Sequence, residues 1–115
     1  MVIVLVNDEY DIEYKYSELD ATKYFGREFS MILWKKTNTS KQIVFRVDNS
    51  HPINTKKGAP HMHTDGYDHF SIFLGGTNKS NFEEFKKQFL EEAVKQTGIS
   101  NKDALERALR QVNPF

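Results

Sequence analysis

A capping box near residue 80 divides the chain into a strand-patterned part and a helical part. Ser80 and Glu83 have the spacing at which each side chain caps the other's backbone N–H at the start of a helix. Apolar residues then recur at helical spacing as far as Gly98, a residue type that commonly ends helices. A second capping signal, Ser100 with Asp103, predicts another helix starting there. The last third of the chain is therefore predicted to form two helices.

Before residue 80 the apolar residues follow strand patterns. A continuous aliphatic run opens the chain and favours a strand that is buried on both faces or central in a sheet. Strands followed by helices predict an α+β domain, here a single domain over residues 1–115. We expect an antiparallel sheet of about four to five strands with the two helices packed on one face. The predicted strands are 2–6, 10–16, 29–34, 43–47 and 69–74, with a short helical turn over 19–24.

Alternation along 43–47 predicts which residues share a face. Ile43, Phe45 and Val47 should face one side, and Arg46 and Asp48 the other. Asn49 and the residues up to 60 are rich in turn formers and predict a long loop.

Composition narrows the function classes. The chain of 115 residues has no cysteine, which excludes a disulfide framework, a thiolate nucleophile and a zinc ribbon. A reducing cytosol fits this, so we expect a cytoplasmic protein. The apolar start is six residues long and lacks both a basic start and a spanning length, so no membrane association is predicted.

Histidine and positive charge gather in the same stretch. All four histidines, His51, His61, His63 and His69, lie within nineteen positions. The net charge of the chain is zero, yet residues 35–63 carry six basic side chains against one acidic side chain. A local basic patch beside imidazoles can attract a phosphate backbone despite zero net charge.

One interpretation of this stretch is metal-free phosphodiester cleavage, with RNA as substrate and no cofactor. His61 and His63 would be the acid/base pair, because two imidazoles can hold opposite protonation states near neutrality. Cleavage also needs a cation at the phosphate and a group that orients an imidazole. The other candidate residues are Arg46, Asp48 and His51 as catalytic groups, with Asn49, Lys56 and Lys57 as substrate contacts.

A second interpretation is a divalent metal site. His61 and His63 are two residues apart, a common way for a strand to present two imidazoles to one ion, and Asp68 and His69 could complete the ligand set. A third is a non-enzymatic interaction protein, in which the basic loop or an aromatic helix face docks a partner. Whether the chain is an enzyme, and whether it forms a homo-oligomer, stays open at this point.

The run from Phe45 to Asn49, the following His51 and the pair His61 and His63 resemble the TumE-type toxins of prokaryotic toxin–antitoxin operons. The resemblance spans about residues 30–90. It implies a toxin that acts on RNA and is partnered by a small helix-turn-helix antitoxin. The chain departs from that pattern in having a single His51 where a pair is usual, and Met62 where a basic residue is common.

Overall fold

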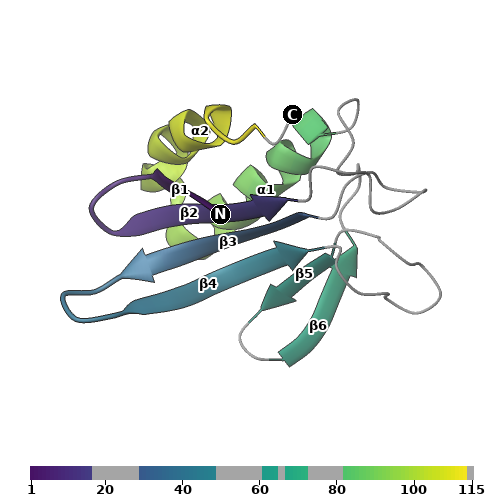
Figure 1. The fold of residues 1–115 in the computed structure, drawn as a ribbon, viewed down its shortest axis with the longest axis horizontal. Helices are drawn as coiled ribbons and strands as arrows, with labels where there is room; N and C mark the ends of the chain where they lie inside the picture. Colours follow the sequence, from purple (N-terminus) through teal and green to yellow (C-terminus); the bar gives the residue numbers. More distant parts are fainter. Residues whose placement is uncertain (17–28, 49–60, 65–66, 73–81, 114–115) are drawn as a thin grey trace.

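The computed structural model describes residues 1–16, 29–48, 61–64, 67–72 and 82–113 (Figure 1). In its last two strands the backbone is described, together with the side chain of Met62. The elements in chain order are β1 Val2–Leu5, β2 Tyr10–Tyr16, β3 Phe29–Lys36, β4 Lys41–Asp48, β5 His61–Thr64, β6 Tyr67–Ile72, α1 Phe82–Thr97, the 3-10 helix η1 Ile99–Asn101 and α2 Lys102–Arg110.

The six strands form an antiparallel meander in which each strand pairs with the next. The β1–β2 turn forms because Asn7 Oδ1 accepts hydrogen bonds from the backbone N–H groups of Glu9 and Tyr10, at 2.9 and 3.0 Å. The β3–β4 turn closes where the Thr37 N–H donates to the Ser40 carbonyl oxygen at 2.8 Å. Both turns lie in short polar segments between the strands.

Both helices lie on one face of the sheet (Figure 1). Phenylalanine rings attach α1 to β3 and β4: Phe29 meets Phe85 edge-on with 5.4 Å between ring centroids, and Phe45 lies 4.7 Å from Phe89. All four side chains are buried. The other face carries none of the described helices and is called the open face below. Its described residues include Ile3, Leu5, Asp11, Glu13, Ser30, Ile32, Arg46 and Asp48.

Helix α1 ends as predicted at Gly98, whose φ of 105° is a conformation that favours glycine. The next helix does not begin at Ser100. Residues Ile99–Asn101 form the 3-10 helix η1 instead, and α2 starts at Lys102. The Asn101 side chain donates to the Thr97 carbonyl oxygen at 3.0 Å and accepts from Asn7 Nδ2 at 3.1 Å, so it joins η1 to α1 and to the β1–β2 turn.

The predicted α+β fold class, with an antiparallel sheet and two C-terminal helices on one face, is confirmed. The described sheet has six strands because His61–Thr64 pairs as a separate short strand between β4 and β6. The predicted helical turn over 19–24, the Ser80 cap and the 49–60 loop lie outside the described residues. None of the described helices is long and apolar enough to cross a membrane.

Two predictions about the faces of these strands are wrong. The strand β1 is neither buried on both faces nor central: it lies at the end of the described sheet, and Ile3 and Leu5 are exposed on the open face. Ile43 does not share a face with Phe45 and Val47, because the β3–β4 register shifts after Leu33, so that Ile43 pairs with Trp34 on the open face. Phe45 and Val47, beyond this bulge, share one face as predicted, and both are buried.

Candidate functional site

Arg46 and Asp48 lie two residues apart on β4 and both lie on the open face. Phe45 and Val47, which alternate with them, are fully buried under the helices. The Arg46 Nε is 3.2 Å from Asp48 Oδ2, which confirms that the two side chains point the same way. Asp48 is buried, whereas 40% of the Arg46 side chain is exposed, so the guanidinium can reach both the carboxylate and solvent.

The contact between these two groups is an ion pair without an aligned hydrogen bond. The Arg46 Nε is itself buried and, within the described residues, its N–H makes no hydrogen bond. At 3.2 Å from the carboxylate oxygen, the N–H therefore does not point at that oxygen. A buried N–H without a hydrogen bond is unfavourable, so this contact stabilises the pair less than an aligned Arg–carboxylate hydrogen bond would.

The strand β5 brings two histidine positions beside this pair. In the β4–β5 ladder His61 is opposite Asp48, and His63 is opposite Arg46. Residues directly opposite one another in an antiparallel pair lie on the same face of the sheet. Their neighbour Met62 is opposite Val47 and is buried in the core, which agrees with this alternation. Positions 46, 48, 61 and 63 therefore fall together on the open face.

The spacing of these four positions follows from sheet geometry. Opposite Cα atoms in an antiparallel pair are about 5 Å apart. Two residues along a strand span about 7 Å. The Asp48 carboxylate and the Arg46 guanidinium therefore lie beside two histidine positions. The four positions together span an area about the size of one phosphodiester group with its two flanking oxygens. The sequence placed these residues on two segments, and the ladder joins them.

The β5–β6 pairing does not assign a face to position 69. Ser71 is opposite the buried Met62, but the register shifts between Met62 and Thr64, and position 69 lies at this irregularity. The side chains of His61, His63, Asp68 and His69 lie outside the described ones, so the metal ligand set stays a prediction.

The remaining predicted site residues belong to the segment between β4 and β5. Asn49, His51, Lys56 and Lys57 lie outside the described residues. Their roles as a further catalytic group and as phosphate contacts stay predictions.

Two residues that the sequence did not single out lie on the same face. Ser30 of β3 is opposite Asp48, so one row across the sheet runs through Ser30, Asp48 and His61. Asp11 of β2 is buried further along, where its carboxylate lies 3.1 Å from Lys36 Nζ and 3.3 Å from Lys41 Nζ. Alternation with Tyr10 and Ile12 places Asp11 opposite to the core, but its two lysine partners follow from strand pairing alone.

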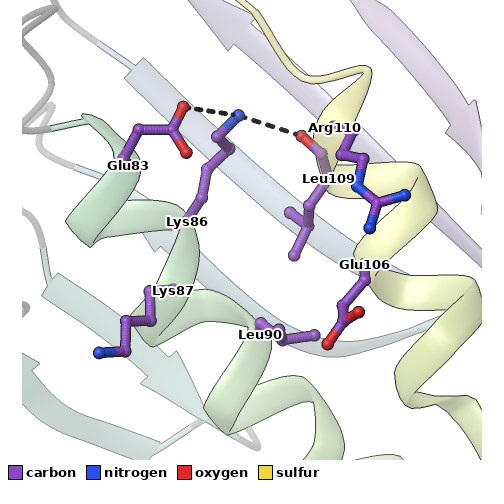
Figure 2. A pocket seen from close by; sticks show the side chains of 7 residues that line it. All are labelled: Glu83, Lys86, Lys87, Leu90, Glu106, Leu109 and Arg110. Carbon is purple, nitrogen blue, oxygen red and sulfur yellow. Dashed lines mark hydrogen bonds and ion pairs between the residues drawn. The ribbon is translucent and has the colours of Figure 1, made fainter.

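A pocket of about 230 Å³ lies between α1 and α2 and contains none of the predicted site residues (Figure 2). Lys86 makes three polar contacts there. Its Nζ is 3.2 Å from Glu83 Oε1 and donates to the carbonyl oxygens of Leu109 and Val112, each at 3.3 Å. A cation that binds the last carbonyls of a helix stabilises its C-terminus. Lys86 therefore holds the end of α2 against α1, which is a structural task. The pocket is lined by Glu83, Lys86, Lys87, Leu90, Glu106, Leu109 and Arg110.

Comparisons of the chain with protein-family models, with curated proteins and with solved structures found no match. The resemblance to TumE-type toxins therefore stays a prediction that rests on the motif residues.

Proposed function

We propose that this protein is the toxin component of a toxin–antitoxin pair and cleaves RNA with histidine acid/base chemistry that needs no metal. The observation that carries the catalytic part is the β4–β5 register, which sets His61 opposite Asp48 and His63 opposite Arg46. The toxin assignment rests on the motif resemblance, which implies a small helix-turn-helix antitoxin as partner.

The reaction starts when a base removes the proton from a ribose 2′-hydroxyl. The 2′-oxygen then attacks the adjacent phosphorus, and a P–O bond forms as the bond from phosphorus to the 5′-oxygen breaks. An acid gives a proton to the departing 5′-oxygen. The products are a 2′,3′-cyclic phosphate and a 5′-hydroxyl end, so every atom and proton is accounted for without an outside reagent.

The charged residues of β4 suggest how the two histidine roles divide. The base becomes cationic as it accepts its proton, and a carboxylate opposite it stabilises that charge; His61, opposite Asp48, suits this role. The acid loses its proton more readily beside a cation, and His63, opposite Arg46, suits that role. The partly exposed Arg46 guanidinium would bind the phosphate, whose negative charge grows in the transition state.

The test is cleavage of a single-stranded oligoribonucleotide by protein purified without an affinity tag. We expect His61→Ala and His63→Ala each to lower the cleavage rate by at least about 10²-fold, the usual contribution of a general acid or base. Growth inhibition in cells should disappear with either change. The variants should still unfold cooperatively, because both positions lie on the face away from the core.

Two controls separate this proposal from the metal interpretation. A substrate with a 2′-deoxy sugar at the cleaved position should stay intact, since it lacks the nucleophile. Chelator should leave the rate unchanged, whereas loss of activity with chelator, restored by a divalent ion, would favour a metal enzyme. Retained cleavage after removal of both histidines would refute the proposed chemistry. A small helix-turn-helix gene next to this one would support the toxin assignment.

A further inference from the structure

The first strand, β1, is exposed in a way that its sequence does not predict. Val2–Leu5 is entirely apolar, yet 52% of Ile3 and 65% of Leu5 are exposed on the open face, while Val4 is buried against the core. Among the described strands β1 pairs with β2 alone and so forms an edge of the sheet. An apolar strand with one free edge is a template for pairing with another strand.

Proteins usually protect such edges with lysine, proline or a bulge. The strand β1 has no charged residue and no proline, and it pairs with β2 in unbroken register from Val2 to Leu5. It therefore has neither a bulge nor a charged side chain over its whole length. Two copies placed antiparallel along this strand would bring no like charges together.

The hydrogen-bond pattern shows which groups face the free edge. The Val6 N–H donates to the Tyr10 carbonyl oxygen at 3.1 Å, in the same register as the β1–β2 ladder. Hydrogen-bonded pairs alternate along an antiparallel ladder, so Val4 and Val2 bond to β2. The N–H and C=O groups of Ile3 and Leu5 then point away from β2. These are the same two residues whose side chains are exposed on the open face.

We propose that two copies of this chain form a dimer by antiparallel pairing of β1 with β1, with Ile3 of each copy opposite Leu5 of the other. Each such pair exchanges both of its backbone hydrogen bonds. The exposed Ile3 and Leu5 side chains then cover one another on the open face. In this register the core faces of the two copies lie on the same side of one continuous sheet. The inference does not depend on the proposed RNA cleavage.

The shortness of β1 limits the affinity of the dimer. Pairing over Val2–Leu5 gives an interface smaller than the roughly 1,200 Å² of total buried surface at which standard stable complexes begin. We therefore expect a concentration-dependent dimer with a dissociation constant in the micromolar range or weaker, about 10⁻⁶ to 10⁻⁴ M. A second copy fits this edge because the strand is complementary to itself and the pairing closes with two-fold symmetry.

Sedimentation of the full chain from about 1 μM to about 1 mM should show conversion from monomer to dimer. The double variant Ile3→Lys/Leu5→Lys should stay monomeric throughout, because lysines would face lysines across the pair. Ile43→Lys is the matched control: 48% of Ile43 is exposed on the same face, but it lies on β4, which β2 and β3 separate from β1. This control should dimerise like the unchanged protein.

The register has its own test in Ile3→Lys/Leu5→Glu. With Ile3 opposite Leu5, this variant places lysine against glutamate twice, so it should still dimerise and should dissociate as salt is raised. All substituted positions are exposed, and cooperative thermal unfolding would show that each variant is folded. A chain that stays monomeric at about 1 mM, or a double-lysine variant that dimerises normally, would overturn the dimer. Dimer loss in the lysine–glutamate variant equal to that in the double-lysine variant would overturn the register.

Discussion

Asp11 and Asp48 are both buried on the open face, but their surroundings differ. The Asp11 carboxylate lies between Lys36 and Lys41, which come from β3 and β4 and fasten the hairpin end of the sheet. Asp48 faces Arg46 of its own strand, and its cross-strand partner on β5 is a histidine. Attraction to the two lysine side chains holds the Asp11 carboxylate in place. Under the proposed function, the Asp48 carboxylate, beside a guanidinium and a histidine position, takes part in acid/base chemistry.

The largest expected difference between the two carboxylates is in catalysis. Asp48→Asn should lower the RNA cleavage rate by about 10²-fold, because the neutral amide cannot stabilise the cationic form of His61. Single-turnover cleavage measured across pH would check this. A positioning role predicts that the pH profile moves as well as the rate. A fall in cleavage with an unchanged profile, accompanied by loss of cooperative unfolding, would mean that Asp48 is structural.

Asp11→Asn should show the reverse behaviour. It removes the charge that Lys36 and Lys41 share, and we expect the free energy of unfolding to fall by about 2 kcal/mol, since hydrogen bonds to charged groups contribute about that much. Cleavage should be unchanged in the folded variant. Urea unfolding and the oligoribonucleotide assay together would measure both. Equal losses of activity in Asp11→Asn and Asp48→Asn would remove the proposed distinction.

Arg46→Lys tests the geometry at the Asp48 end. A lysine keeps the positive charge but loses the planar group that can contact a carboxylate and a phosphate together. We expect a drop of about 10-fold in kcat/KM, or about 1.4 kcal/mol, with stability nearly unchanged because the side chain is partly exposed. Steady-state kinetics would show it. Full activity with lysine would mean that charge alone suffices there.

The smallest expected effects are on stability, and they should differ between the two lysines that contact Asp11. Lys36 also donates to the Asn7 carbonyl oxygen at 2.9 Å, and 24% of its side chain is exposed, so Lys36→Met should cost about 1 kcal/mol of unfolding free energy. Lys41, with 44% of its side chain exposed, should contribute only about 0.5 kcal/mol, and less in high salt. Urea unfolding at low and high salt would rank them, and an equal cost would show that the Asn7 contact contributes nothing.

The fold class could be predicted because it follows from local periodicity. The helical repeat after residue 82 and the alternation along β2 and β3 each lie within a short stretch of chain. Local sequence patterns gave wrong predictions where pairing between distant segments decides the structure. The bulge after Leu33 exposed Ile43. Residues Ile99–Asn101 form η1, and the Asn101 side chain bonds to Asn7 and Thr97, where the local pattern predicted a helix start.

The candidate site was predictable in composition and only partly in arrangement. Arg46 and Asp48 share a face because they are two residues apart on one strand, and the same rule holds for His61 and His63. That the two pairs are opposite one another could not be predicted, because a register between strands depends on how the intervening chain closes. The position of Ser30 opposite Asp48 could not be predicted for the same reason, since it also depends on the register between strands.

The sequence by itself determined the order of strands and helices and the helix end at Gly98, because each depends on residues close together in the chain. The tertiary structure alone decided that Asp48 is opposite His61, that Asp11 lies between two lysines, and that the apolar strand β1 is an edge. These features depend on which distant segments become neighbours. Pairing between distant strands is settled by the whole core, and no short stretch of sequence encodes it.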